Sequence, residues 1–262
     1  MGWVDASTAR NAAVASFVAP LVARLLSSSA RKKWNAYFHQ FDDAGMKRHA
    51  TTLRWYHKAQ TITSIPALVV FIQAAYVPFL VWAENRDDVQ LAVLDDPVLN
   101  KISPVDLSLP ASILIYGALY LFLITETGNP RNLLATMKTS LFGLSLRILF
   151  LYATPLKCPE DAPELADIFT EAQTGAHGQS SALTNDLMFS GHTFSLSVMF
   201  LHCTSKCLKP AYFIAAVAVA CCVIAQHVHY TVDVLVAPFV AFACFRLSIE
   251  LFHAHDAPGH FK

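Results

Sequence analysis

Long apolar runs constrain this chain more than any other feature of its sequence. A helix that crosses a bilayer core needs about 20 consecutive, mostly apolar residues. Six stretches reach or approach that length: residues 62–83, 109–125, 133–153, 187–208, 210–226 and 232–252. They take up so much of the 262 residues that little remains for a water-soluble domain. The sequence therefore predicts an all-α integral membrane protein with six transmembrane helices.

Composition and charge agree with this fold class. Hydrophobic residues make up 55% of the chain and charged residues only 15%, whereas a soluble domain carries about 25% charged residues. Nineteen basic and nineteen acidic side chains give a net charge of zero, which argues against a nucleic-acid partner. The six cysteines follow no disulfide framework, and five of them lie in apolar stretches, where cysteine is usually a small hydrophobic residue.

The basic residues predict how the chain is oriented, because Lys and Arg gather in the short cytosolic flanks of membrane helices. Nine of them precede the first apolar run, namely Arg10, Arg24, Arg31, Lys32, Lys33, Lys47, Arg48, Arg54 and Lys58. The connection between the first and second runs and that between the third and fourth are instead rich in Asp and Glu. We therefore expect both termini in the cytosol, and the first, third and fifth connections outside the cell or in a lumen.

The two terminal segments are predicted to be cytosolic. Residues 1–60 form an N-terminal segment and residues 253–262 a short tail. The apolar run at residues 12–23 is too short to span a bilayer, so we interpret it as an interfacial amphipathic helix. Alternatively, residues 1–33, which are rich in Ala, Ser and Arg and contain one acidic residue, form part of a transit peptide.

Ionisable residues at the outer ends of the runs mark a candidate site. His192 opens the fourth run, and His229 follows it by 37 residues. That spacing equals two helices of about 18 residues, so the chain returns His229 to the depth of His192. Asp233 lies four residues after His229 and shares its face if the turn is helical. Two histidines and a carboxylate that meet in this way can supply a nucleophile, its orienting group and a general acid.

Two further residues are expected beside this group. Arg147 lies six residues before the outer end of the third run, about 9 Å below it at helical rise. An arginine at that depth needs an anionic partner, and a phosphate is a natural one, although a structural pairing with a carboxylate is an alternative. Asp186, six residues before His192, is close enough to join the site at its rim.

The remaining histidines have other interpretations. His227 and His229 could both reach one metal ion, because alternate histidines in a turn can point to the same place. His202 lies deep in the fourth run, where a single histidine is usually an interhelical hydrogen-bonding residue.

Two of these motifs resemble those of the sphingomyelin synthases, within the wider type 2 phosphatidic acid phosphatase superfamily. Residues 186–193 read DLMFSGHT, and residues 229–234 read HYTVDV. Residues 146–159, which read LRILFLYATPLKCP, resemble the family's third span, where an arginine precedes an exit rich in Thr, Leu and Pro. The resemblance implies that residues 61–252 form a six-span catalytic domain whose active site faces the exoplasmic or lumenal side.

The chemistry that this resemblance implies is a two-step transfer of a phosphoalcohol headgroup. His229 would attack phosphorus, Asp233 would orient it, and His192 would protonate the leaving alcohol and later act as a base. The residues expected to bind substrate are Arg147, Ser190, Gly191, Asp186 and Tyr230. The headgroup, phosphocholine or phosphoethanolamine, would pass from a glycerophospholipid to ceramide or another lipid alcohol and release diacylglycerol. The family needs no metal or organic cofactor and lies in Golgi, endoplasmic reticulum or plasma membranes.

The chain departs from the hydrolytic members of the superfamily, which carry a Lys-x6-Arg-Pro segment and a Ser-Arg pair before the second histidine. Here Arg147 is followed by Ile148, and residues 221–226 contain no basic residue. A phosphomonoester carries close to two charges and a diester one, so a single buried arginine favours a transferase. Thr184 and Asn185 replace the family's usual Cys-Gly. The alternatives are a lipid phosphate phosphatase and a catalytically silent membrane scaffold.

Overall fold

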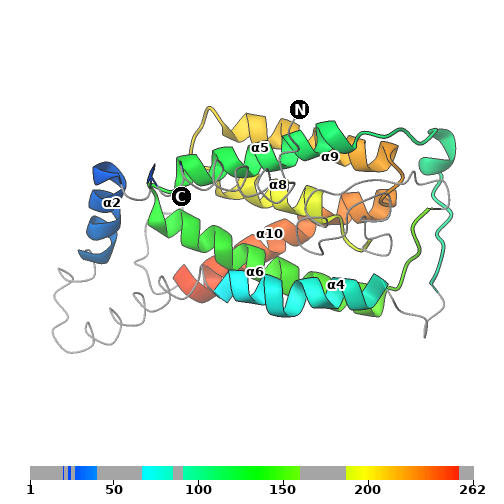
Figure 1. Ribbon diagram of the computed structural model, residues 1–262, viewed down its shortest axis with the longest axis horizontal. Helices are drawn as coiled ribbons and strands as arrows, with labels where there is room; N and C mark the ends of the chain where they lie inside the picture. Colours follow the sequence, from blue (N-terminus) through cyan, green and yellow to red (C-terminus); the bar gives the residue numbers. More distant parts are fainter. Residues whose placement is uncertain are drawn as a thin grey trace, which may run out of the picture.

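The computed structural model describes residues 20, 23–24, 27–39, 67–84, 91–159 and 187–253. In this part of the chain the longer elements are η1 (Ile72–Tyr76), α4 (Val77–Glu84), α5 (Ser108–Glu126), α6 (Pro130–Ala153), α8 (Gly191–His202), α9 (Lys209–Ala225) and α10 (Thr231–His253). Two further elements are α2 (Ser28–His39) and the short 3₁₀ turn η2 (Leu99–Lys101). Successive helices from α4 to α10 run in alternating directions along the long axis of the molecule (Figure 1).

The helices bear out the predicted class of an all-helical integral membrane protein. Four of them are long and apolar enough to cross a membrane: Ala67–Glu84, Ser108–Glu126, Pro130–Ala153 and Thr231–Glu250. Helix α9 is apolar but has only 17 residues, and α8 has 12. Within the predicted fourth span, residues 187–208, the structure is therefore helical over little more than half the length. Six spans stay a prediction, and the predicted interfacial helix at residues 12–23 lies outside the described residues apart from residues 20 and 23.

Local hydrogen bonds explain why α8 is short. The side chain of Ser190 caps its start, where its Oγ accepts from the Thr193 N–H (3.4 Å). At its other end, Cys203 has an extended backbone conformation. The next residue, Thr204, donates both its N–H (3.1 Å) and its hydroxyl (2.8 Å) to the buried carboxylate of Glu126 in α5. These bonds hold the chain away from the helical path.

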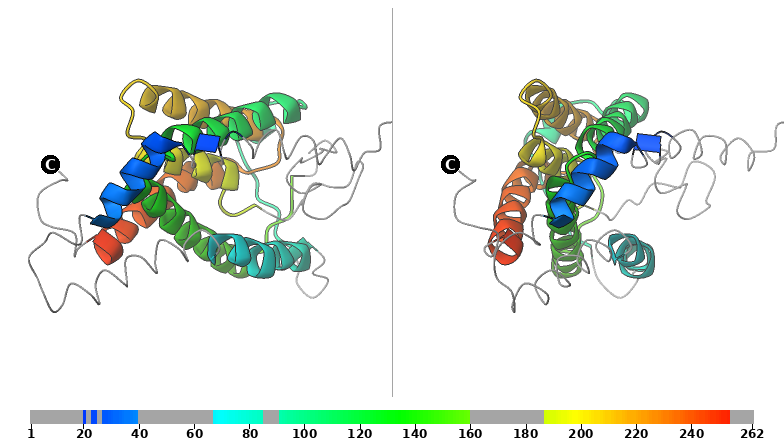
Figure 2. Two further views of the ribbon diagram at one scale, coloured as in Figure 1. Left: turned by 60° about the vertical axis from the view of Figure 1, so that its left-hand side comes forward. Right: turned by 90° about the vertical axis from the view of Figure 1, so that its left-hand side faces the viewer.

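Helix α8 nevertheless lies at the centre of the bundle, surrounded by α5, α6, α9 and α10 (Figures 1 and 2). One buried cluster joins it to α5, α9 and α10, and consists of Ile115, Phe122, Leu196, Met199, Cys203, Tyr212, Ala216, Val219, Val223 and Val234. A second joins it to α10 and consists of Phe189, Phe194, Val198, Ala237, Val240, Ala241 and Cys244. Gly143 allows α6 to approach closely, because a Cβ at that position would collide with the ring of Phe194.

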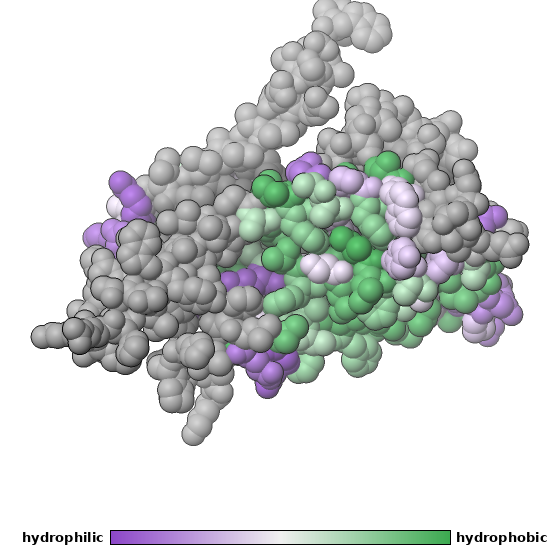
Figure 3. All heavy atoms as spheres, turned by 90° about the horizontal axis from the view of Figure 1, so that it is seen from below, coloured by the Kyte–Doolittle hydropathy of each residue, from purple (hydrophilic) through white to green (hydrophobic). Residues whose placement is uncertain are grey.

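The outside of the bundle is apolar, as a lipid-facing surface must be. Leu109 and Ile113 on α5, Ile214 on α9, and Leu235 and Phe239 on α10 each expose more than half of their surface. The space-filling view shows such an apolar face across the described residues (Figure 3).

Helix α2 lies near the start of α6, across the end of the bundle that we predicted to face the cytosol (Figure 2). Following that prediction, this end is called the inner end and the opposite one the outer end. Its Trp34 donates the indole N–H to the carbonyl of Thr127 at the end of α5 (3.1 Å). This contact fixes part of the predicted cytosolic segment against the membrane helices.

Candidate active site

The turn between α9 and α10 brings His229 to the outer end of the bundle. Helix α9 ends in a Schellman motif, in which the His227 N–H donates to Ile224 O (3.0 Å) and the Val228 N–H to Val223 O (3.3 Å). His227 takes the left-handed conformation that this motif requires, with a φ of 56°. The motif reverses the chain at once, so that His229 turns back toward the helices.

The start of α10 places Asp233 against His229. The Asp233 Oδ2 atom accepts from the Tyr230 N–H (3.0 Å) and lies 3.6 Å from His229 Nδ1. A carboxylate in the first turn that reaches back to the N-cap amide is one half of a capping box, and it fixes the position of the side chain. Asp233 is fully buried and His229 is 5% exposed. At 3.6 Å the two groups are slightly beyond hydrogen-bond distance. A small approach would let the carboxylate accept the Nδ1 proton and stabilise the imidazolium.

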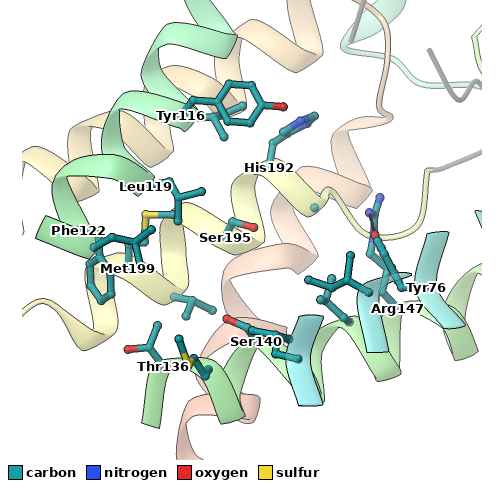
Figure 4. A pocket seen from close by; sticks show the side chains of 18 of the residues that line it. Tyr76, Tyr116, Leu119, Phe122, Thr136, Ser140, Arg147, His192, Ser195 and Met199 are labelled. Atoms are coloured by element: carbon teal, nitrogen blue, oxygen red, sulfur yellow. Dashed lines mark hydrogen bonds between the residues drawn. The ribbon is translucent and has the colours of Figure 1, made fainter. Parts of the chain in front are cut away.

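The backbone joins this turn to the start of α8. The Ser190 N–H donates to the carbonyl oxygen of Asp233 (3.2 Å). Two residues later, His192 projects from the first turn of α8 into a cavity, on the side that faces Tyr116 of α5 (Figure 4). The two motifs, separated by 37 residues between their histidines in sequence, therefore meet at one place.

Arg147 of α6 approaches the same place and is 4% exposed. Its Nε–H donates to Phe189 O (2.9 Å), and its Nη1–H donates to the hydroxyl of Tyr76 (2.6 Å). Gly191 makes room for the guanidinium, because a Cβ on this glycine would lie 2.6 Å from Arg147 Nη1. These contacts fix the orientation of a cation that the bundle otherwise buries among apolar side chains.

Tyr76 is the part of this arrangement that we did not predict from the sequence. It ends the π-helical turn η1, a local widening of the first long helix that is often found at functional sites. The turn directs the Tyr76 hydroxyl to Arg147 (Figure 4). A tyrosine in an apolar run is ordinarily interpreted as an interface anchor, so only the neighbouring position of α6 gives it this role.

These side chains line one cavity of about 370 Å³. Its polar lining residues are Tyr76, Tyr116, Thr136, Ser140, Arg147, His192, Ser195 and His229. The rest of the wall is almost entirely apolar, with side chains such as Leu80, Leu119, Leu144 and Met199 from α4, α5, α6 and α8. The cavity extends from His192 and Arg147 between the helices toward Phe122 and Thr136 (Figure 4). It can therefore hold a molecule with one anionic end and a long apolar part.

The structure brings together most of the predicted site residues, although in different ways. His192, His229, Arg147 and Gly191 line the cavity, and Asp233 lies behind His229. Asp186 lies outside the described residues.

Two residues that we predicted to bind substrate are engaged elsewhere. Ser190 is fully buried as the cap of α8, and it is not among the residues that line the cavity. The hydroxyl of Tyr230 accepts from the Leu94 N–H (3.2 Å) and donates to Lys157 O (2.9 Å), so this side chain points to the outer connections. In the structure, helix capping and loop contacts use these two groups, and a role of either residue in binding substrate stays a prediction.

The structure also bears on the metal site considered for His227 and His229 and on the interhelical role predicted for His202. In the described residues no group of three or more His, Cys, Asp and Glu side chains is arranged to hold a metal ion, so His227 and His229 have no third ligand there. His202 bonds Thr139 (2.9 Å) and Asn132 (3.3 Å) of α6 through its two ring nitrogens. It therefore has the interhelical role that we predicted.

Comparison with known proteins gives one match. Residues 184–250 match the family model described as PAP2 superfamily C-terminal. No curated protein matches the chain. The matched segment contains α8, α9 and most of α10, and with them His192, His229 and Asp233. The match supports the type 2 phosphatidic acid phosphatase superfamily, and thus an enzyme with chemistry of the lipid phosphatase or phosphotransferase type.

Proposed function

We propose that this protein is a lipid phosphotransferase of the sphingomyelin synthase type. It moves a phosphoalcohol headgroup, phosphocholine or phosphoethanolamine, from a glycerophospholipid to ceramide or a similar lipid alcohol, and it releases diacylglycerol. The observation that carries the proposal is the shared cavity. A histidine beside a buried carboxylate, a second histidine and a fixed arginine all adjoin a cavity whose long wall is apolar.

The first step forms a phosphorylated histidine. Asp233 faces Nδ1 of His229, so Nε2 is the nitrogen that attacks phosphorus. The bond between phosphorus and the diacylglycerol oxygen breaks, and His192 donates its proton to that oxygen. Arg147 binds the non-bridging phosphate oxygens, on which negative charge develops in the transition state.

The second step returns both histidines to their starting states. The hydroxyl of ceramide attacks phosphorus while His192 accepts the hydroxyl proton. The bond between phosphorus and Nε2 of His229 breaks, and the headgroup leaves on the new lipid. Asp233 stabilises the positive charge that His229 carries in the intermediate.

Two observations favour a transferase over a phosphatase. Among the described residues that line the cavity, Arg147 is the only Lys or Arg. One guanidinium matches the single charge of a phosphodiester better than the nearly two charges of a monoester. The apolar wall also suits a second lipid as the acceptor, whereas a hydrolase requires water at that position.

The test uses the purified full-length protein in liposomes. Fluorescent ceramide is supplied with phosphatidylcholine, phosphatidylethanolamine, phosphatidylinositol or phosphatidic acid, one at a time. We expect a new phosphosphingolipid from one of the first two donors. His229→Ala should lower its formation by about 10⁴-fold or more, because the nucleophile is lost.

His229→Gln serves as a second variant of similar size, and size-exclusion profiles report whether each variant is folded. Release of inorganic phosphate from phosphatidic acid, with no sphingolipid product, would replace the proposal by a lipid phosphate phosphatase. Unchanged lipid activity in both folded variants would instead support the silent scaffold.

A further inference from the structure

The connection before α5 and the connection after α6 meet beside the start of α10. Ala92 bridges to the segment that follows α6, with its N–H donating to Pro155 O (3.1 Å) and its carbonyl accepting from the Lys157 N–H (2.9 Å). From this bridge the first connection continues through residues 94–99, beside the turn that carries His229. The function proposed above gives this contact no role.

One buried carboxylate, that of Asp96, joins the first of these connections to the start of α10. Asp96 is 8% exposed. Its Oδ2 accepts from the Thr231 N–H (2.7 Å), and its Oδ1 accepts from the Thr231 hydroxyl (3.1 Å). On its own connection, Oδ1 also accepts from the N–H groups of Val98 (2.9 Å) and Leu99 (3.3 Å). Four donors thus converge on a single side chain.

The bonds to Thr231 matter because this residue begins α10. Thr231 is the first residue of α10, and the first N–H groups of a helix have no partner within it. The Tyr230 N–H is bound by Asp233, from inside the helix. Asp96 supplies the matching acceptor for the next N–H from a connection 135 residues earlier in the chain. A negative charge at this end of a helix is also favoured by the helix dipole.

We propose that Asp96 is a positioning residue, which holds the turn from His229 to Asp233 in the geometry that the transfer requires. This inference rests on the proposed function. The side chain of Asp96 does not line the cavity, so it acts through Thr231. Loss of its bonds frees the first turn of α10, and with it the 3.6 Å approach of Asp233 to His229.

A second contact supports the same role. The hydroxyl of Tyr230 lies between the two outer connections, accepting from Leu94 and donating to Lys157. Burial raises the pKa of this hydroxyl, so it keeps the proton that it donates. Burial also acts to raise the pKa of Asp96, but the hydrogen bonds from Thr231, Val98 and Leu99 outweigh it and hold the pKa below its ordinary value. Asp96 therefore stays charged across the physiological range.

The test compares Asp96→Asn with Asp95→Asn in the full-length protein. Asp95 is the matched control, because it is the adjacent acidic residue and bonds only the exposed side chain of Asn100 among the contacts found for it (2.7 Å). We expect Asp96→Asn to lower kcat by about 10–100-fold, as loss of an orienting partner does, with KM for both lipids unchanged. Asp95→Asn should match the wild type. Thr231→Val, which removes only the hydroxyl donor, should lower kcat less, and it should add nothing to Asp96→Asn.

Three results would overturn the inference. Equal kcat values in the two Asn variants would leave Asp96 without a role. A higher KM with unchanged kcat would make Asp96 a substrate-binding residue. A lower unfolding temperature with normal activity per folded molecule would make it purely structural.

A readout that is independent of lipid chemistry separates this inference from the proposed function. Diethyl pyrocarbonate acylates imidazole nitrogens, and mass spectrometry can follow its reaction with His229 and His192 separately. Asp96→Asn should change the rate at His229 and leave the rate at His192 unchanged. If the wild type transfers no lipid headgroup but this selective change is seen, the proposed function fails while the positioning role stands. Equal rates at His229 in the wild type and the variant would refute the positioning role directly.

Discussion

Helix α8 carries a buried polar site at each end, and the two differ in how their histidines are used. At its start, His192 projects into a cavity beside Arg147 and His229. At its end, both ring nitrogens of His202 are bonded to α6, and its ring packs edge-on against Phe245 of α10. The polar groups of the outer site adjoin a cavity, whereas the described groups of the inner site bond one another.

The surroundings of the inner histidine extend this contrast. Thr139 bonds Ser248 as well as His202, and Asn132 bonds Glu126 as well as the His202 carbonyl. A polar network that is satisfied in this way rigidifies a helix bundle. The difference shows that a histidine at membrane depth does not by itself indicate catalysis. What distinguishes the outer one is an adjoining cavity.

The largest expected effect tests the outer end. His192→Ala should lower the transfer rate by about 10²–10⁴-fold, because the proposed general acid and base is lost. Its unfolding temperature in detergent should stay close to that of the wild type, since the side chain faces a cavity. The measurement is kcat with fluorescent ceramide, paired with a thermal unfolding curve. A folded variant with normal kcat would remove His192 from the mechanism.

At the inner end, replacing the histidine should lower stability and leave activity nearly unchanged. His202→Ala leaves Thr139 and Asn132 with fewer partners, which should lower the free energy of unfolding by about 1–3 kcal/mol. Activity per folded molecule should remain within a few-fold of the wild type. Thermal unfolding of both variants, measured in the same detergent, gives the comparison directly. If His202→Ala abolished activity without loss of stability, the two ends would be functionally alike.

The smallest expected effect is a change in KM that tests whether the apolar wall of the cavity binds the acyl chain. Leu119→Trp places a larger side chain in the apolar part of the cavity, and it should raise KM for long-chain ceramide by about 10-fold, equivalent to about 1.4 kcal/mol. A short-chain ceramide should be affected less, because it reaches less far along the wall. Leu121→Trp, on the exposed face of the same helix, is the matched control. Equal changes for both chain lengths would show that the acyl chain binds elsewhere.

The hydropathy of the sequence predicted the positions of most membrane helices, but not all helix ends. The apolar runs locate α4, α5, α6, α9 and α10, because burial in lipid requires long apolar segments. They do not locate the ends of α8, since hydropathy contains no information about the Glu126 carboxylate that binds Thr204. Nor do they indicate α2, a polar helix whose position depends on the contact of Trp34 with Thr127.

The site was predictable where the spacing of residues determined it. His192, His229 and Asp233 follow from helix length and an i, i+4 relation, and Arg147 from its depth. Tyr76 and Asp96 could not be found in the same way, because each acts on a residue of another segment. Packing decides which membrane helices and connections are neighbours. The sequence pattern of a single segment contains no information about these neighbours.

The cavity between the helices has a consequence for how the protein meets a lipid substrate. Its apolar wall belongs to α4, α5, α6 and α8, and the first three of these helices lie in segments long and apolar enough to cross a membrane. A lipid that reaches it does so by diffusing within the plane of the bilayer. The variable that sets the rate is then the mole fraction of that lipid in the membrane. Dilution with inert lipid should slow the reaction, whereas dilution of the whole vesicle suspension should leave the rate per vesicle unchanged.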